Sequence, residues 1–215
     1  GHCAMCHTPM GAFGQAEADK VFQGGVLGRF AAPDITPEGL SERGWTKADL
    51  EQYFKKGIAP QGSTFSDMYL VMKNSTQYMT SADIKAIATY LMGDEPLKPK
   101  EVTLKVVTDS NNGRDLYLNM CAACHNENGL GKPNVAVSMI GNSTVRNPDS
   151  RNLIVAILDG LPWQVFPDYE RLQAMPAFKD ELDNAEIAEL TNYLRATWAG
   201  LPADVTEAEV KALRQ

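Results

Sequence analysis

The sequence predicts an all-α fold with two tandem domains, each with a hydrophobic core of its own. The pattern Cys-x-x-Cys-His occurs twice, beginning at Cys3 and at Cys121. A similar tripeptide lies near the end of each half, Thr89–Leu91 in the first and Asn192–Leu194 in the second. Repetition on this scale indicates a duplicated domain. The chain has 215 residues, of which 44% are hydrophobic. That is enough for two cores of about 100 residues each.

Capping residues predict two helices in the first domain. Thr46 can cap a helix over residues 47–56, because its side-chain oxygen accepts a hydrogen bond from a free N–H of the first turn. Thr80 and Asp83 form a capping-box pattern for a second helix that reaches Met92. The apolar face of this second helix consists of Ile84, Ile87, Ala88 and Leu91.

Three helices are predicted in the second domain. One covers residues 112–121 and leads into the second cysteine pattern. Another begins at Asp149 or Ser150 and ends near Gly160, and the last begins at Asp183. The apolar face of the last helix consists of Ile187, Leu190, Tyr193 and Leu194.

The first of these helices has no counterpart in the first domain. Tyr117 on that helix is the expected crossing partner of Tyr193, but the first cysteine pattern follows almost directly on Gly1. A domain of this kind needs the helix–helix contact. We therefore expect the natural polypeptide to extend upstream, with a signal peptide among the missing residues.

Residues 95–110 are predicted to form a linker. Pro96 and Pro99 favour an extended path, and Val102–Val107 is typical of a short strand. The predicted organisation is a first domain over 1–94, this linker, a second domain over 111–198 and a polar tail over 199–215, in which Thr206 and Glu209 cap a short helix.

Both cysteine patterns indicate covalently attached haem. Two thiols about one helical turn apart can form thioethers with the two vinyl groups of a haem, and the histidine that follows can bind its iron. The sequence therefore predicts two haem c groups. The predicted attachment and proximal residues are Cys3, Cys6 and His7 in the first domain, and Cys121, Cys124 and His125 in the second.

Three other uses of paired cysteines fit this sequence less well than haem attachment. Zinc ribbons also pair two Cys-x-x-Cys patterns, but about 15–20 residues usually separate the pairs, far fewer than here. A thioredoxin-like redox pair needs βαβ surroundings, which the pattern of elements does not suggest. Disulfides would leave the histidine after each pair without a purpose. All four cysteines and two of the three histidines are used by haem attachment.

The second axial ligand of each iron is predicted to be methionine. His7 and His125 already serve as proximal ligands, and the remaining histidine, His2, lies on the wrong segment for the first haem. A soft thioether stabilises ferrous iron and raises the reduction potential. In the second domain Met175 is the choice, because it precedes Pro176 on an irregular stretch just before the last helix.

In the first domain three methionines lie between the two predicted helices. Met79 directly precedes the Thr80 cap, and Met72 lies among apolar neighbours, as an ordinary core residue does. Met68 is the predicted distal ligand. In the second domain, Met120 and Met139 are predicted to be core residues.

Composition excludes several classes of function. The chain has 20 basic and 27 acidic residues and no basic stripe, so nucleic-acid binding is not expected. No apolar run approaches the roughly 20 residues that a membrane-spanning helix needs. Any association with a membrane is expected to occur through missing segments or through partners.

The sequence resembles the cytochrome c subunit of bacterial membrane-associated alcohol, gluconate and aldehyde dehydrogenases. Members of this family usually contain three haem domains. Gly1–Pro9 resembles its second haem site and Ala32–Thr36 its motif beside the proximal histidine. Met68 with the stretches after it resembles the segment of the distal methionine. The other matching segments are Ser75–Thr80, Ala86–Leu91, Cys121–His125, Met175–Phe178 and the tail around Thr197–Thr206.

The resemblance implies a fold of cytochrome c-type domains that each wrap around one covalent haem. It places Pro33 and Tyr90 beside the first haem and, by the repeat, Tyr193 beside the second. It also implies a periplasmic location and a dehydrogenase catalytic subunit as electron donor. The acceptor would be quinone, a terminal oxidase or a soluble cytochrome. A first haem domain is not part of these 215 residues, so we expect either a two-haem relative of the family or a fragment of a three-haem chain. The chain also has Val137 or Ser138 where the family has a proline.

Two functions were compared. The leading one is electron transfer by two six-coordinate haems, without a substrate of the chain's own. Trp163 and Phe166 are then candidates for a docking surface. The alternative is a dihaem enzyme, such as a peroxidase or a sulfur-compound oxidase, with one open iron position. That alternative needs a distal acid–base group, and no spare histidine is available.

Overall fold

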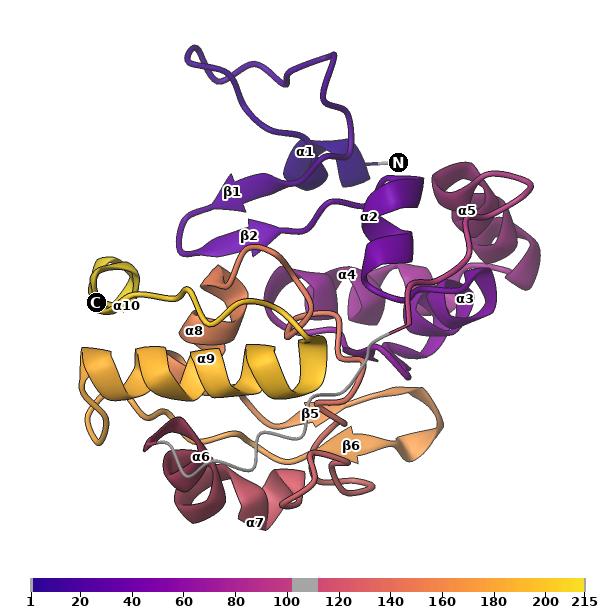
Figure 1. The fold of residues 1–215 in the computed structure, drawn as a ribbon. Coiled ribbons are helices and arrows are strands. Elements are labelled where there is room, and N and C mark those ends of the chain that lie inside the picture. The colour runs from indigo at the N-terminus through magenta and orange to yellow at the C-terminus, as the bar shows by residue number, and fades with distance from the viewer. Residues whose placement is uncertain (1, 102–111, 215) are drawn as a thin grey trace.

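The structure is a computed structural model that describes residues 2–101 and 112–214, and helices dominate it (Figure 1). The first half contains α1 (Cys3–His7), β1 (Gly25–Leu27), β2 (Phe30–Ala32), α2 (Pro37–Glu42), α3 (Lys47–Lys56), β3 (Ile58–Ala59), β4 (Gly62–Ser63), α4 (Ser66–Asn74), η1 (Thr76–Tyr78) and α5 (Ser81–Met92). The second half contains α6 (Asn112–Leu116), η2 (Tyr117–Cys121), α7 (Ala122–His125), α8 (Arg151–Asp159), β5 (Gln164–Val165), η3 (Pro167–Tyr169), β6 (Arg171–Leu172), α9 (Asn184–Ala199) and α10 (Glu207–Leu213).

The helices predicted from capping patterns are present. Within the described residues, α3, α5, α9 and α10 each begin with a capping box, in which the cap and the third helical residue satisfy each other's backbone N–H groups. Gly57 ends α3 in the left-handed conformation, which costs glycine little. The predicted helix over 112–121 is also helical throughout, but its second part, η2, is a π-helix.

Several elements have no counterpart in the sequence prediction. Within residues 2–101 and 112–214, three antiparallel hairpins, β1–β2, β3–β4 and β5–β6, connect the helices. Their strands are two or three residues long, too short for an alternating pattern. Helix α4 was also missed, because Phe65 at its start makes no side-chain capping bond. Met68 therefore lies on a helix and not on a loop. The predicted strand Val102–Val107 lies outside the described residues.

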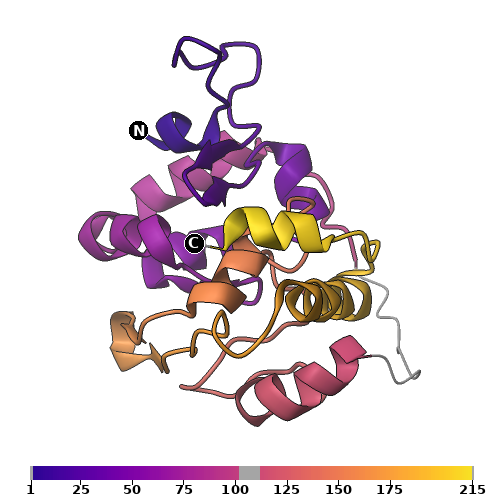
Figure 2. The same cartoon turned by 90° about the vertical axis from the view of Figure 1, so that its left-hand side faces the viewer.

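The second half has a core built around α9. Helix α6 crosses α9 so closely that a Cβ on Gly113 would lie 2.3 Å from the backbone oxygen of Glu189. The predicted contact between Tyr117 and Tyr193 is present, with ring centroids 5.8 Å apart. Figure 2 shows α10 lying across α8 and α9, and all three helices contribute buried apolar side chains to the core of the second half.

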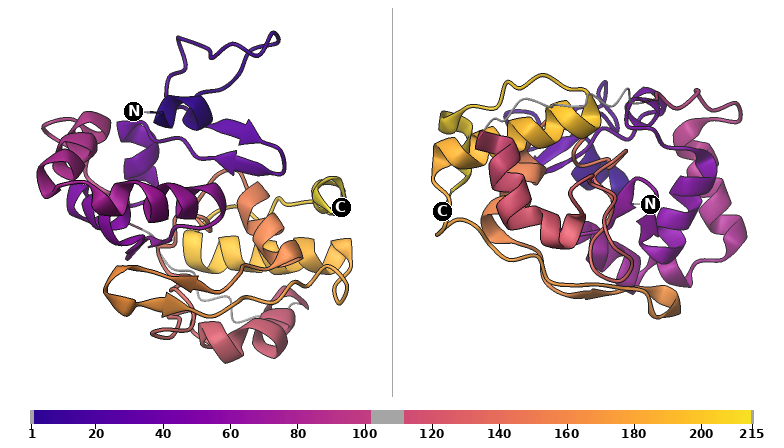
Figure 3. Two further views of the ribbon diagram at one scale, coloured as in Figure 1. Left: turned by 180° about the vertical axis from the view of Figure 1, so that it is seen from behind. Right: turned by 60° about the horizontal axis from the view of Figure 1, so that its bottom comes forward.

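The core of the first half is smaller and surrounds a cavity. Helices α3 and α5 pack together on the side of the molecule away from α9, as Figure 3 shows. The predicted apolar face of α5 is largely buried: Ile84, Ala88 and Leu91 are each at most 5% exposed. Tyr90 on the same helix borders the cavity and is 76% exposed.

Polar side chains join the two halves. Arg146 donates to the backbone oxygens of Glu42 and Lys100, at 2.6 and 2.7 Å. Ser143 donates its backbone N–H to the Gln61 carbonyl at 2.7 Å. Helix α8 of the second half lies between strand β2 of the first half and α9 (Figure 1). Among the described residues, no helix is both long and apolar enough to cross a membrane.

Candidate haem-binding sites

The first cysteine pattern lines a large cavity. Because α1 is helical, Cys3 and Cys6 lie one turn apart on the same face. Both cysteines and His7 line a cavity of about 1320 Å³. This volume exceeds the roughly 300–1,000 Å³ of ordinary small-molecule pockets. The cavity therefore has room for a large cofactor beside the thiols.

The walls of this cavity are mostly apolar. They are contributed by the β1–β2 hairpin and by α2, α3, α4 and α5. The larger apolar residues that line it include Phe22, Ile35, Leu40, Leu50, Phe54 and Leu91. Such walls fit the flat, apolar face of a porphyrin and exclude water from it.

His7 is oriented by a backbone carbonyl. His7 is 7% exposed, and its Nδ1 donates to the Pro33 backbone oxygen at 2.7 Å. Burial lowers the pKa of His7, and the Pro33 bond partly opposes that shift. A neutral imidazole with its proton on Nδ1 leaves the Nε2 lone pair free, which is the form that binds iron. The predicted role of His7 fits this geometry.

Two of the three methionines between α3 and α5 line the cavity. Met68, in the first turn of α4, and Met79, after η1, are both among the lining residues. The Met79 backbone oxygen accepts a bond from Lys55 Nζ at 2.7 Å. Met72 is 1% exposed and is not among the lining residues, as predicted for a core residue. The choice between Met68 and Met79 stays a prediction in favour of Met68.

The other two residues predicted beside the first haem also border the cavity. Pro33 lines it and supplies the carbonyl that holds His7. Tyr90 lines it from α5 and meets the ring of Phe22 edge-on, with centroids 6.2 Å apart.

Polar groups gather where the cavity meets the second half. Arg43 is 3% exposed. It donates to the backbone oxygen of Asp34 at 2.6 Å and to Ser143 Oγ at 3.0 Å. Trp45 Nε1 lies 3.1 Å from the same Ser143 Oγ. Burial lowers the pKa of Arg43 to about 10, against the opposing effect of Asp34. All three side chains line the cavity. The N–H groups of Arg43 that are left over would suit the carboxylates of a haem.

These polar residues were missed at the sequence level. Arg43 and Trp45 flank Gly44 just before the α3 cap, which is a local pattern that could have been noticed. Ser143, Thr144, Asn147 and Asn152 also line the first cavity, although they belong to the second half. No local signal connects them to a site that is so distant in sequence.

The second cysteine pattern forms α7 at the end of a continuous helical segment. Cys121 is partly buried, Cys124 is exposed, and burial raises the pKa of Cys121 to about 12. Burial also lowers the pKa of His125, and the Val137 backbone opposes that shift. His125 Nδ1 nevertheless has no hydrogen bond of ordinary geometry. The Val137 backbone is thus near His125, but it does not make the hydrogen bond that the Pro33 oxygen makes with His7.

Met175 is fixed at the C-terminal end of α8. Its backbone N–H and oxygen pair with Leu161 at 2.9 and 3.0 Å. Gly160 has a φ of 69°, and a Cβ there would lie 2.3 Å from the Met175 oxygen. The Met175 side chain is partly buried against the same core cluster as Cys121. Met175 stays the predicted distal ligand, held on a stretch whose backbone is well anchored.

The other second-half residues named from the sequence have the following surroundings. Tyr193 is 8% exposed and packs against Tyr117 and Trp198. Its role beside the haem stays a prediction. Met139 is a core residue and Met120 packs against the core, as expected. Trp163 is 57% exposed, but Phe166 is buried against Tyr69, so Phe166 is not available as a docking residue.

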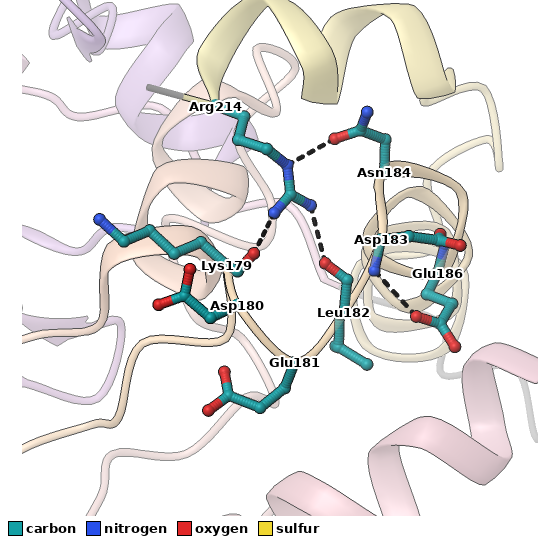
Figure 4. Close-up of a pocket in the computed structure, with 8 residues that line it drawn as sticks. All are labelled: Lys179, Asp180, Glu181, Leu182, Asp183, Asn184, Glu186 and Arg214. Carbon is teal, nitrogen blue, oxygen red and sulfur yellow. Dashed lines mark hydrogen bonds between the residues drawn. The ribbon is translucent and has the colours of Figure 1, made fainter.

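A shallow surface hollow lies on the loop before α9, and the side chain of Arg214 lines one side of it. Figure 4 shows Arg214 pointing into the loop that precedes α9. It donates to Asn184 Oδ1 at 2.6 Å, to the Leu182 oxygen at 2.8 Å and to the Lys179 oxygen. This arrangement ties the end of α10 to the loop, and we assign it a structural role.

The cytochrome c family model matches residues 1–93 and 110–198 of the chain. This chain belongs to the cytochrome c family. The two matched regions are the two halves that contain the cysteine patterns, so the predicted duplication of a cytochrome c domain is confirmed.

Several curated proteins are similar to this cytochrome c along its whole length. It is 30% identical to the cytochrome c subunit of the quinone-type alcohol dehydrogenase of Gluconacetobacter polyoxogenes, covering 100% of this chain and 50% of that protein. It is 28% identical to the fructose dehydrogenase cytochrome subunit of Gluconobacter japonicus, covering 99% and 49%. It is 28% identical to the gluconate 2-dehydrogenase cytochrome c subunit of Pantoea cypripedii, covering 100% and 54%.

The chain spans about half the length of these relatives. All three are named as cytochrome subunits of dehydrogenases, which confirms the resemblance found in the sequence. Their names also agree with the prediction of an electron-transfer subunit as opposed to a catalytic one. Within the described ranges, no three His, Cys, Asp or Glu side chains gather as they would around a bare metal ion.

Proposed function

We propose that this cytochrome c binds two haem c groups, one in each half, and passes electrons from a dehydrogenase catalytic subunit to an acceptor. The observation that carries the proposal is the first cavity. Its lining combines Cys3 and Cys6, the oriented imidazole of His7 and the side chain of Met68. When bound, haem c supplies an iron that alternates between the ferric and ferrous states.

The residues of the chain would hold and tune that iron. Cys3 and Cys6 attach the macrocycle, and His7 donates Nε2 while the Pro33 carbonyl keeps its ring in place. Arg43 has N–H groups beyond those that bond Ser143 and Asp34, and it offers these to the haem carboxylates. The corresponding residues of the second half are Cys121, Cys124, His125 and Met175.

The proposed partners follow from the relatives and from exposure. Three of the relatives are cytochrome subunits of alcohol, fructose and gluconate dehydrogenases, which supports a dehydrogenase as donor. Cys3 and Cys124 are exposed, so the thioether edge of each haem would reach the surface. We assign the chain to the periplasm, with quinone, a terminal oxidase or a soluble cytochrome as acceptor. We also retain the domain boundaries 1–94 and 111–198.

Intact mass spectrometry of the matured protein tests the haem count. We expect two covalent haem additions, one addition in a Cys121→Ala/Cys124→Ala variant, and one in a Cys3→Ala/Cys6→Ala variant. A wild-type chain with fewer than two additions would refute the proposal.

The absorption spectrum tests the distinction between a carrier and an enzyme. A six-coordinate carrier should show a thioether-to-iron band for each oxidised haem and should not bind carbon monoxide when reduced. Carbon monoxide binding to one haem of the fresh protein would instead favour the dihaem enzyme.

A further inference from the structure

Asn152 of the second half clamps a strand of the first half. Its side-chain Nδ2 donates to the Ala31 oxygen at 2.7 Å, and its Oδ1 accepts from the Ala31 N–H at 2.8 Å. Asn152 is 9% and Ala31 is 7% exposed, so water does not compete for these bonds. Two bonds in opposite directions fix both the position and the orientation of the Ala31 backbone.

The clamped strand leads directly to the carbonyl that orients His7. Ala31 lies on β2, and Pro33 follows the end of that strand. The Pro33 oxygen accepts the Nδ1 proton of His7 at 2.7 Å. A short chain of contacts therefore runs from Asn152 through β2 and Pro33 to the imidazole. Asn152 itself also lines the first cavity.

We propose that Asn152 is a positioning residue for the proximal histidine of the first haem, supplied by the second half of the chain. This inference rests on the proposed function, because His7 must bind iron for its orientation to matter. The bond from Nδ1 to a carbonyl makes the imidazole a stronger donor, which favours ferric iron and lowers the reduction potential. The second half thereby sets part of the potential of the first haem.

The clamp also connects the two candidate sites through one helix. Asn152 is the second residue of α8, and Gly160, which meets the Met175 backbone, directly follows its last residue. Arg29, at the turn of the β1–β2 hairpin, pairs with Asp159 near the same end of α8. The hairpin therefore lies along α8 and is held at both ends.

The test compares Asn152→Ala with the wild-type dihaem protein. The first readout is the exchange with solvent of the His7 Nδ1 proton, followed by NMR. We expect this exchange to become on the order of tenfold faster, because two hydrogen bonds of ordinary strength are lost. The second readout is the reduction potential of the first haem, which should shift upward.

Tyr69→Phe is a matched control across the same interface. The Tyr69 hydroxyl donates to the Val165 oxygen at 2.9 Å and accepts from the Val165 N–H at 3.3 Å, so it also clamps one backbone residue. These two bonds are to Val165 and not to β2 or Pro33, so we expect His7 exchange to stay at the wild-type rate. Equal exchange rates in wild type, Asn152→Ala and Tyr69→Phe would overturn the inference.

A third variant covers the case in which Asn152→Ala does not mature. Asn152→Asp keeps the acceptor for the Ala31 N–H and loses the donor, and an acidic residue is favourable in the first turn of α8. Its His7 exchange rate should exceed the wild-type rate, and an unchanged rate would again overturn the inference. If an Asn152 variant contains both haems and its His7 Nδ1 proton exchanges at the wild-type rate, only the inference about Asn152 is refuted. If the wild-type protein lacks the first haem, the proposed function is refuted.

Discussion

Met68 and Met79 both present side chains to the first cavity, and they differ in how their backbones are held. Met79 directly precedes the capped start of α5, and its oxygen is tied to Lys55. Met68 lies in the first turn of α4, on the stretch that resembles the segment of the distal ligand in the dehydrogenase subunits. The two residues can be separated by substitution, because a leucine has the volume of methionine but no sulfur.

We expect Met68→Leu to remove the thioether-to-iron band of one haem and to lower the potential of that haem, while Met79→Leu keeps the band. Absorption spectra of both oxidised variants make the comparison. Met72→Leu is the packing control, and its volume-conserving change should cost less than about 1.5 kcal/mol in the free energy of unfolding. If Met79→Leu lost the band and Met68→Leu kept it, the assignment would have to be exchanged.

Tyr117 is a second residue whose role can be isolated. It is fully buried, and its hydroxyl donates to the backbone oxygen of Asn126, the residue after His125. Burial raises the pKa of Tyr117 above the ordinary tyrosine value. The native state therefore keeps this proton at pH values where the unfolded chain loses it.

Tyr117→Phe should lower the free energy of unfolding by about 1 kcal/mol near neutral pH, because the Asn126 oxygen loses its donor. The difference from wild type should shrink above about pH 10, where the unfolded wild-type chain begins to ionise and only the wild type loses stability for that reason. Guanidinium unfolding at several pH values measures both effects. Tyr78→Phe, at a 75% exposed site, should leave stability unchanged. A difference that grows with pH would contradict this explanation.

Among the helices, α8 affects more of the candidate chemistry than its length suggests. Its first turn provides Asn152 to the first half, and its end meets the Met175 backbone. The Phe178 and Lys179 N–H groups donate to the carbonyls of Ile157 and Leu158 on the same helix. The segment that contains the predicted distal ligand of the second haem is thus fixed to α8 along its length.

Gly160→Ala should displace Met175 and weaken or abolish the thioether band of the second haem. The new Cβ would lie 2.3 Å from the Met175 oxygen, which real structures do not tolerate. Gly141→Ala is a matched control, because Gly141 has a φ of 72° and nothing within 4 Å of the added Cβ. It should cost about 1 kcal/mol of backbone strain and leave the spectrum intact. Equal spectra for the two variants would show that Gly160 is not needed to hold Met175 in place.

The helices could be predicted where residues close together in the sequence form a helix cap. Thr46, Thr80 and Asp183 each combine a capping side chain with an acidic residue three positions later, and the structure begins a helix after each. Helix α4 has no such cap, and its start, with Ser66 at a φ of 51°, depends on tertiary packing.

The candidate sites divide in the same way. Cysteine and histidine could be named because haem attachment needs them within five consecutive residues. The choice of distal ligand in the first half could only be narrowed to three methionines, because all three lie in one stretch of the sequence. The fold decides which of them reach the cavity. Ser143 and Asn152 could not be found, because they meet Arg43 and Ala31 only after the two halves have packed together.

At the scale of the whole molecule the two halves are unequal. The second half encloses large, fully buried side chains such as Tyr117, Ile154 and Ile187 around α9. The first half has a smaller cluster, around Leu40, Trp45 and Leu50, and many of its apolar side chains face the cavity. Haem would therefore complete the core of the first half, which otherwise has little to pack against.

Removing the first haem should consequently unfold the first half and spare the second. In a Cys3→Ala/Cys6→Ala variant the apolar walls of the roughly 1320 Å³ cavity would face water, and each deleted contact costs burial free energy. Hydrogen exchange by mass spectrometry should show amides of α3 and α5 losing protection while those of α9 keep it.

The clamp at Ala31 gives this experiment a second readout, because Asn152 loses its partner when β2 unfolds. The start of α8 should then lose protection, whereas the rest of α8, packed against α9, keeps it. Full protection of α3 and α5 without haem would show that the first half has a sufficient core of its own, and equal loss in α9 would show that the two halves unfold as one unit.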